Sequence, residues 1–478
     1  MSLRKQTFSG LIWTFLDAVV ARGVGIAAAI ILARLLSPRE FGLMGMIYIF
    51  TSISASIVDS GLTASLIRSK NTDNIDFSTV FYTNIGISVF LYGIIFMCAP
   101  YISGFYSEPQ LVAIIRVYAF IFVINSFSAV QQTLFQKKMD FKKLMILNIP
   151  GIIIGAIIGV AMAYNNFGVW SIITMQLITQ ALYSIMLWVI SDWKPSFVFS
   201  NNRLKKHYKF GYKLMLSGIL NSAFENVYNV LIGRFFSTAA LGQFERARSF
   251  SNYPVIVLSS IVGKVSYPML SGIQDDKEKL TAAYKQVLQF IVFICAPLML
   301  GLSAVSKPLI LLLLGPQWEQ AAVFFQILCI SGMLYPVHAF NLNLLKVYGR
   351  SDWFLKLEVY KKIMIVLVVT IAFQFGIYGL VWGSVVISIL ALIINTHYTN
   401  RLIGYNLWNQ FKDVWVILLL SILMFLIMYT GQFYFFSENL WLKILVPSTV
   451  GLLFYAIVNL LLKTNSIHLL LQFKQHLK

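Results

Sequence analysis

The sequence reads ARLLSPREFG at positions 33–42, and a similar stretch, GRFFSTAALG, occupies positions 233–242. Both stretches follow a long apolar run, both carry arginine at the second position, and they lie 200 residues apart. Two more pairs of similar stretches follow in the same order, at offsets of 211 and 212 residues: 167–171 with 378–384, and 140–141 with 352–353. Similar stretches in a constant order at a nearly constant offset indicate an internal repeat.

The composition excludes a water-soluble enzyme. Of the 478 residues, 58% are hydrophobic and 12% are charged, and the mean hydropathy is +0.77. Soluble domains carry about 25% charged residues, so this chain must place apolar side chains against lipid. The sequence contains no Walker A, GxSxG or HExxH motif, and its three cysteines have no neighbouring ligand residues at metal-binding spacing. We therefore predict no catalytic residues, no metal and no cofactor.

Apolar runs near 20 residues, the length that crosses a bilayer, define the predicted architecture. Each repeat contains six such runs, and an even number of crossings gives the two copies the same orientation in the membrane. The longest polar interval, 191–213, is too short for a soluble domain. The fourteen runs begin near Phe8, Phe41, Val80, Leu111, Leu144, Gly168, Leu214, Leu241, Val287, Ala321, Leu355, Tyr378, Phe411 and Leu440.

The predicted fold class is an all-α polytopic membrane protein with fourteen transmembrane helices. Two six-helix lobes are expected, residues 1–200 (spans one to six) and 201–405 (spans seven to twelve). Residues 406–464 then form spans thirteen and fourteen. The tail, 465–478, alternates apolar and polar residues and is expected to lie on the cytoplasmic surface as an amphipathic helix.

The charge distribution sets the expected orientation. The formal charge is +19, from 37 Lys and Arg against 18 Asp and Glu. Most of the basic residues lie in alternate loops, whereas the intervening loops 107–110, 164–167, 375–378 and 430–439 contain no Lys or Arg. Because basic loops stay in the cytoplasm, both termini are predicted to be cytoplasmic. Membrane topology accounts for the basic composition, and no nucleic-acid partner is expected.

Ionisable residues inside the spans are the candidate functional residues, because each costs at least about 2.5–3.5 kcal/mol at the bilayer centre unless paired or wetted. Arg22 and Glu225, in repeat-related spans one and seven, lie at depths that differ by about 3 Å. Opposite charges at one depth suggest a polar cleft shared by the two lobes. Buried structural pairs, for example Arg22 with Asp59, are the alternative. The full set is Asp17, Arg22, Asp59, Glu225, Glu245, Arg246, Arg248 and Lys264.

Specific stretches resemble a known family. Positions 33–43, followed by DSGLTASLI at 59–67, are similar to the first hairpin of bacterial polysaccharide exporters of the Wzx type. The stretches IGRF at 232–235 and AALG at 239–242, with Arg246-x-Arg248 after them, share this resemblance. Wzx proteins belong to the multidrug/oligosaccharidyl-lipid/polysaccharide (MOP) flippase superfamily. In span number, parallel repeat and motifs, the resemblance covers essentially the whole chain.

The resemblance implies a transporter of the bacterial inner membrane that works by alternating access. The implied cargo is a lipid-linked oligosaccharide on undecaprenyl pyrophosphate, used for O-antigen, capsule or exopolysaccharide. An H⁺ or Na⁺ gradient is the implied energy source, and membrane lipids and other polysaccharide-assembly proteins are candidate partners. Two alternatives stay open: a membrane-embedded polysaccharide polymerase or ligase, and a drug or lipid II transporter of the same superfamily.

The site residues follow from this function. Arg22, Arg246 and Arg248 are predicted to contact pyrophosphate or acidic sugars, because a guanidinium binds phosphate oxygens in pairs and stays charged when partly desolvated. Arg234 and Lys264 are further cleft candidates, although Arg234 lies at a helix end where bonding of loop carbonyls is the alternative role. Glu225, Asp17 and Asp59 are the ion-coupling candidates. For Glu225 the alternative is that it only neutralises Arg22.

Overall fold

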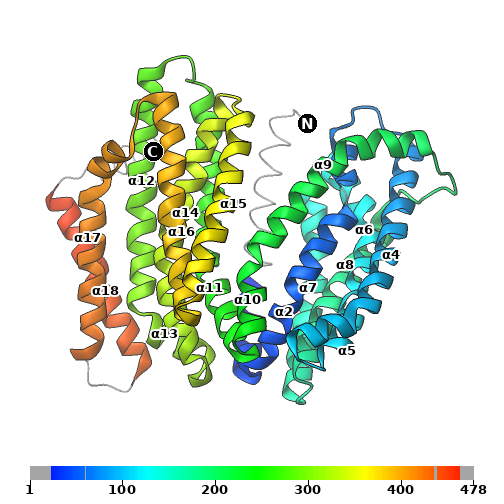
Figure 1. Cartoon of the computed structure of the whole chain (residues 1–478), viewed down its shortest axis with the longest axis horizontal. Coiled ribbons are helices and arrows are strands. Elements are labelled where there is room, and N and C mark those ends of the chain that lie inside the picture. The colour runs from blue at the N-terminus through cyan, green and yellow to red at the C-terminus, as the bar shows by residue number, and fades with distance from the viewer. Residues whose placement is uncertain (1–22, 60, 435–438, 463–478) are drawn as a thin grey trace. The chain divides into compact units, whose positions relative to one another are not determined.

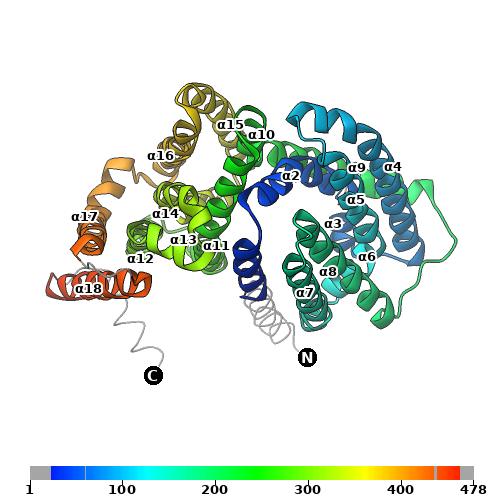
Figure 2. The same cartoon turned by 90° about the horizontal axis from the view of Figure 1, so that it is seen from below.

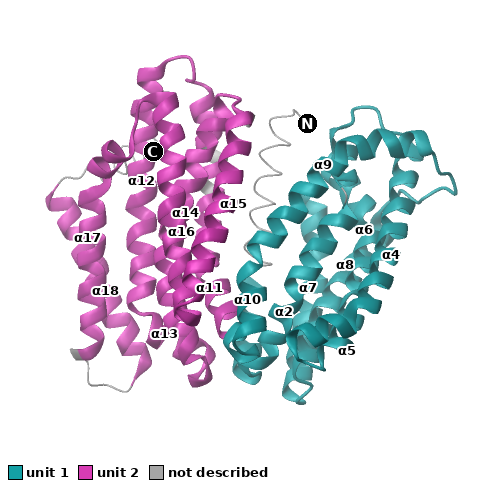
Figure 3. Cartoon of the chain, viewed as in Figure 1, with its two compact units in different colours: residues 1–242 teal, residues 243–478 magenta. Residues whose placement is uncertain are grey.

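A computed structural model describes residues 23–59, 61–434 and 439–462 of the chain, and every regular element in these ranges is helical (Figure 1). The predicted all-α membrane fold class is confirmed. The chain divides into two compact units, residues 1–242 (unit 1) and 243–478 (unit 2), shown in teal and magenta in Figure 3. The repeat boundary predicted at residue 200, the later boundaries at 405 and 464, and the tail at 465–478, which lies outside the described residues, stay predictions.

Unit 1 is built from a short helix at Gly23–Leu35 and the helices α2 to α10, with the start of α11. Its helices pack mainly as the pairs α7 with α8, α4 with α6, α6 with α8 and α2 with α9. The bounds are α2 (Pro38–Asp59), α3 (Leu62–Arg68), α4 (Asn74–Tyr106), α5 (Leu111–Tyr118), α6 (Phe120–Lys137), α7 (Phe141–Tyr164), α8 (Val169–Ile190), α9 (Asn201–Glu225), α10 (Val227–Phe235) and α11 (Thr238–Ser271).

Unit 2 contains the rest of α11 and the helices up to α18. Its long helices pack in the spatial order α15, α16, α14, α12, α17, α18 (Figure 2). At its core, Tyr284 of α12 stacks on Phe340 of α14 with 4.4 Å between ring centroids. The bounds are α12 (Lys277–Ala304), α13 (Ser306–Leu314), the 3-10 turn η1 (Pro316–Trp318), α14 (Glu319–Val347), α15 (Ser351–Phe373), α16 (Gly376–Ile403), α17 (Leu407–Tyr434) and α18 (Leu440–Leu461).

The predicted spans can be compared with these helices. Within the described ranges, ten helical segments are long and apolar enough to cross a membrane. The helices α9, α11 and α15 fall outside that set, although the sequence predicts spans there. The first predicted span lies largely in residues 1–22, outside the described part of the chain, so the count of fourteen stays a prediction.

Span seven is broken in the middle, which differs from the single helix expected there. The first helix, α9, ends at Glu225, and α10 starts at Val227. A break inside a span needs partners for its polar groups, because lipid supplies none. The side-chain amide of Asn226 donates to the carbonyl of Ser222 at 2.8 Å and to the hydroxyl of Ser52 at 3.1 Å. Asparagine at this position therefore supports the end of α9.

The two similar stretches of the sequence meet in unit 1. A Cβ added at Gly42 would lie 1.7 Å from the carbonyl oxygen of Thr238, and one added at Gly242 would lie 1.8 Å from the carbonyl oxygen of Pro38. Gly42 and Gly242 are separated by the repeat offset of 200 residues, and so are Pro38 and Thr238. A reciprocal contact of this kind is what two-fold-related copies make. Only glycine leaves room for the two helix starts to cross so closely.

Candidate functional site

The predicted site residues fall into three groups. Asp17 and Arg22 lie outside the described residues, and so does the side chain of Lys264, whose backbone belongs to α11. Asp59, Glu225 and Arg234 belong to unit 1. Glu245, Arg246 and Arg248 belong to unit 2. Each unit is therefore taken separately, and the pairing of Arg22 with Glu225 or Asp59 stays a prediction.

A seam of small polar side chains joins α2 to the broken span in unit 1. We call Ser52, Ser56, Ser222 and Asn226 the serine–asparagine seam. The hydroxyls of Ser56 and Ser222 lie 3.3 Å apart, and the Ser222 hydroxyl also donates to the carbonyl of Ser52 at 3.4 Å. One turn beyond the seam, the amide of Asn229 donates to the carbonyl of Gly45 at 3.3 Å. These bonds hold α2, α9 and α10 together.

Glu225 and Asp59, the two coupling candidates of unit 1 that the structure describes, lie at different levels of this interface. Glu225 is the exposed last residue of α9, next to the buried Asn226 of the seam. Asp59 is the exposed last residue of α2 and accepts a hydrogen bond from Thr63. Ser52 of the seam and Asp59 are seven residues apart on α2, which is about 10 Å along the helix axis. The structure does not bring the two coupling candidates of unit 1 together.

Both acids occupy helix C-termini, which has an electrostatic consequence. The C-terminal end of a helix carries a partial negative charge, about half an elementary charge, from its unsatisfied carbonyl groups. A carboxylate placed there, in a span, is electrostatically unfavourable on its own. Such a position favours binding of a cation, which is the chemistry that ion coupling requires.

Arg234 closes the end of another helix. Its guanidinium donates to the carbonyl of Phe105 at 2.5 Å and lies 5.2 Å from the centre of the Phe105 ring. Phe105 belongs to the last turn of α4, where carbonyl groups have no partner within the helix. This is the geometry of the carbonyl-bonding role considered from the sequence. A contact of Arg234 with cargo stays a prediction.

The basic pair of unit 2 lies in the first part of α11. The guanidinium of Arg248 is 3.6 Å from the carboxylate of Glu245, whose side chain is 10% exposed, while Arg246 and Arg248 are half-buried. Gln243 anchors this turn, because its amide donates to the carbonyl of Gln317 at 2.6 Å and accepts from the backbone N–H of Ala321 at 2.9 Å. The segment therefore presents two arginines with one acid beside them, on a helix start fixed to η1 and α14.

Sequence reasoning missed a carboxylate that connects the two repeat stretches. Glu108, between α4 and α5, accepts from Arg39 at 2.8 Å and from the hydroxyl of Thr238 at 2.5 Å. Arg39 lies in the first stretch and Thr238 in the second. Burial opposes ionisation of Glu108, but the bonds from Thr238 and Arg39 outweigh it and hold the pKa of this carboxyl below its usual range.

Sequence reasoning also missed a buried polar network in unit 1, because His207 lies more than 130 residues from its two partners in the sequence. The imidazole Nε2 of His207 lies 3.1 Å from the carboxylate of Asp76, and Nδ1 lies 2.8 Å from the hydroxyl of Ser65. Arg203 pairs with Asp73 at 2.9 Å and with Asp76 at 3.4 Å. The side chains of His207 and Asp76 are fully buried. Serine, histidine and aspartate meet here, but burial gives no access to substrate, so the network joins α3, α4 and α9 structurally.

The sequence matches a known protein family and several individual proteins. Residues 31–323 match the family described as "Polysaccharide biosynthesis protein". The chain belongs to this family. It is 25% identical over 398 residues to the lipopolysaccharide biosynthesis protein WzxC of Escherichia coli (strain K12), a match that covers 83% of this chain and 81% of WzxC. It is 28% identical over 331 residues to the succinoglycan biosynthesis transport protein ExoT of Rhizobium meliloti (strain 1021), covering 69% and 67% of the two chains.

The fold matches a solved flippase structure. The inward closed conformation of the lipid II flippase MurJ superposes with a TM-score of 0.76 over 95% of this chain and 99% of MurJ, at 13% identity. At that identity the match shows the fold alone. It confirms the fold expected from the resemblance, and the match to WzxC confirms the resemblance itself. This member of the polysaccharide biosynthesis family is a multi-pass membrane protein.

Proposed function

We propose that the protein is an inner-membrane flippase that carries a lipid-linked oligosaccharide repeat unit outward by alternating access. The carrier lipid is undecaprenyl pyrophosphate, and the repeat unit serves a surface polysaccharide. The observation that carries the proposal is the family match over residues 31–323 in a chain with the fold of a lipid flippase. The names of WzxC and ExoT, a lipopolysaccharide biosynthesis protein and a succinoglycan biosynthesis transport protein, support the same class of cargo.

The proposed cargo contacts are basic residues. Arg22, Arg246 and Arg248 bind the pyrophosphate or acidic sugars, and Arg234 and Lys264 are secondary candidates. The half-buried position of Arg246 and Arg248 on an anchored helix start supports this role, because partial burial strengthens guanidinium–phosphate bonds. Glu245 beside them reduces the positive charge of the segment and favours release of the anion after transport.

The proposed coupling residues are acids in the first two and seventh spans. Glu225 takes up H⁺ or Na⁺ when anionic cargo occupies Arg22, and Asp17 and Asp59 are the next candidates. The position of Glu225 at a helix C-terminus beside the serine–asparagine seam supports cation binding there. Both termini are proposed to be cytoplasmic, with the lobes divided at residue 200. Other polysaccharide-assembly proteins are proposed partners.

Reconstitution tests this function directly. The purified full-length protein is placed in liposomes that carry a fluorescent undecaprenyl-pyrophosphate-linked oligosaccharide in one leaflet. We expect the probe to reach the other leaflet faster than in protein-free liposomes, and its oligosaccharide to keep its length. A lengthened oligosaccharide would indicate a polymerase or ligase. Movement of lipid II or of a cationic drug, without movement of the oligosaccharide lipid, would instead indicate another transporter of the superfamily.

A further inference from the structure

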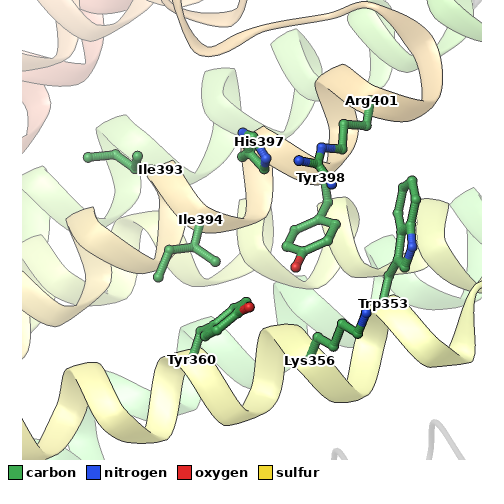
Figure 4. Close-up of a pocket in the computed structure, with 8 residues that line it drawn as sticks. All are labelled: Trp353, Lys356, Tyr360, Ile393, Ile394, His397, Tyr398 and Arg401. Atoms are coloured by element: carbon green, nitrogen blue, oxygen red, sulfur yellow. The ribbon is translucent and has the colours of Figure 1, made fainter.

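A groove lies between α15 and α16 in unit 2, and none of the residues that line it is among the site residues proposed above. Its volume is about 480 Å³, within the range of small-molecule sites. It is formed by the first three turns of α15 and the last three turns of α16, and Figure 4 shows side chains from both helices around it. The lining residues are Trp353, Lys356, Tyr360, Ile393, Ile394, His397, Tyr398 and Arg401.

Three nitrogen-bearing side chains line this groove from its two walls. Lys356 belongs to α15, whereas His397 and Arg401 lie one turn apart on α16 (Figure 4). All three are exposed, and within the described part of the chain none of them has an ion pair or a hydrogen bond. Two permanent positive charges and an imidazole thus converge on one concave site without a protein counter-charge.

Basic residues next to the groove are paired with acids, unlike those that line it. Arg350 is paired with Asp352 at 2.9 Å and stacks on the ring of Trp353 at 3.9 Å. Lys361 is paired with Glu358 at 2.5 Å. This end of α15 therefore contains acids that neutralise the cations outside the groove, while the groove keeps its positive charge. An anion from outside the protein is the complementary partner.

The rest of the groove is apolar, which restricts the anion to an amphiphile. Trp353 and Tyr398 pack with 5.5 Å between ring centroids and form one side of the groove. Exposed apolar side chains continue from it along both helices, at the three- and four-residue spacing that keeps them on one helix face. On α15 these are Tyr360, Ile363 and Leu367, and on α16 they are Ile393, Ile389 and Val386.

The position of the groove along α15 and α16 agrees with the binding of a lipid headgroup. Residues 353–360 and 393–401 lie at the ends of α15 and α16 that the expected topology places at the cytoplasmic surface. Cationic and aromatic side chains are typical of that depth. A guanidinium and an ammonium on opposite walls suit the oxygens of a phosphate group, and the apolar faces below suit its hydrocarbon chains.

We propose that the groove between α15 and α16 binds the phosphate group of a membrane lipid. Lys356 and Arg401 supply the charge, His397 supplies a further hydrogen bond, and the apolar stripes of both helices bind the chains. Two lipids carry this chemistry, a resident phospholipid such as phosphatidylglycerol and the polyprenyl phosphate carrier. The residues that line the groove differ from the proposed cargo and coupling residues, and its occupancy does not depend on the proposed function.

Native mass spectrometry of the purified full-length protein tests the proposal by counting bound lipids. The protein is titrated with phosphatidylglycerol, with undecaprenyl phosphate, and with phosphatidylcholine as the zwitterionic comparison. We expect one of the two anionic lipids to bind, and the double variant K356Q/R401Q to bind it about tenfold more weakly, since hydrogen bonds to charged groups are lost. The matched control is K205Q/K209Q, which removes two exposed positive charges from α9 and should bind as the wild type does.

The outcomes distinguish a resident phospholipid from the carrier lipid, and some of them would contradict the proposed site. A loss confined to phosphatidylglycerol identifies a resident phospholipid, and a loss confined to undecaprenyl phosphate identifies the carrier. Equal binding by the wild type and the double variant, or equal binding of phosphatidylcholine, overturns the proposal. If the double variant does not fold, a photoactivatable analogue of the bound lipid is crosslinked to the wild type. Labelling within 353–360 or 393–401 supports the site, and labelling only elsewhere overturns it.

Discussion

Gly42 and Gly242, 200 residues apart, occupy equivalent places in a reciprocal contact, each against the backbone at the start of the other's helix. The repeat seen in the sequence is therefore also a packing relationship. Glu108 strengthens the same junction, because it binds Arg39 of one repeat stretch and Thr238 of the other.

Alanine at either glycine should be strongly destabilising. A methyl group at Gly42 or Gly242 would lie less than 2 Å from a backbone carbonyl oxygen, and overpacking of this kind costs about 1–3 kcal/mol or more. The melting temperature and folded yield of G42A and G242A in detergent measure the effect. Gly86→Ala and Gly93→Ala are matched controls, because open space surrounds both sites within 4 Å. Equal melting of all four variants would contradict the close crossing.

Loss of the Glu108 carboxylate should have a pH-dependent effect. The pKa of Glu108 is lowered in the folded protein, so its contribution to stability is fully present above the unfolded value of about 4.3 and is lost as pH falls through the folded pKa. The melting temperature of E108Q should therefore lie below that of the wild type at pH 7, and the difference should shrink as the pH approaches 3. A constant difference across this range would show that the charge of Glu108 does not matter. Glu319→Gln controls for loss of an exposed ion pair.

Removal of His207 should destabilise unit 1 more than removal of Arg203. His207→Ala leaves the fully buried carboxylate of Asp76 without its imidazole partner, and breaking a buried pair costs about 3–5 kcal/mol. Arg203 is 37% exposed, and pairs of that exposure contribute about 0–1 kcal/mol. Thermal melting of H207A and R203Q should show this order. The reverse order would mean that Asp76 depends on the guanidinium instead.

Glu225→Gln should uncouple transport without stopping it. Under the coupling hypothesis, reconstituted E225Q still flips cargo down its gradient but no longer responds to an imposed pH or sodium gradient. If Glu225 only neutralises Arg22, the variant should be less stable and still respond to the gradients. Flipping assays with and without each gradient separate the two models. Asp59→Asn is the comparison, since Asp59 lies about 10 Å along α2 from Ser52, the residue that Asn226 contacts next to Glu225.

Arg22 and Arg234 should respond differently to alanine. Arg22→Ala is expected to reduce export at least about tenfold at normal membrane abundance, because phosphate contacts through a guanidinium are lost. Arg248→Ala should behave in the same way. Arg234→Ala should instead lower abundance or melting temperature, since it removes the bond to the last turn of α4. Export normalised to membrane protein distinguishes these results, and full export by R22A would remove Arg22 from the site.

The sequence predicted the positions of the helices better than their interruptions. Apolar runs starting near Phe41, Leu144 and Phe411 lie within α2, α7 and α17. The break at Asn226 was not predicted, because a hydropathy average is insensitive to one polar residue whose effect depends on Ser52, 174 residues away. A signal was nevertheless present. The positions 203, 207, 211, 218, 222, 226 and 229 are polar or glycine at helical spacing, and they form the face of α9 and α10 that meets α2, α3 and α4.

The candidate site was predictable only in part, because contacts between residues distant in the sequence are not visible in it. Ionisable residues in spans are visible in a sequence because lipid makes them costly, which is how Glu225, Arg246 and Arg248 were found. Their partners come from contacts distant in sequence, such as Arg234 with Phe105, 129 residues earlier. The groove between α15 and α16 gave no signal, because Lys356 and Arg401 resemble ordinary loop cations until their two helices are placed together.

The separation of Asp76 and His207 in the sequence imposes a delay between the synthesis of the two partners of this buried pair. The two residues are 131 positions apart, and at about 5–20 residues per second a ribosome needs roughly 7–26 s to pass from one to the other. Over that interval the nascent chain has α3 and α4 but lacks the imidazole that covers Asp76. Unit 1 therefore cannot complete its packing around Asp76 until α9 has been synthesised.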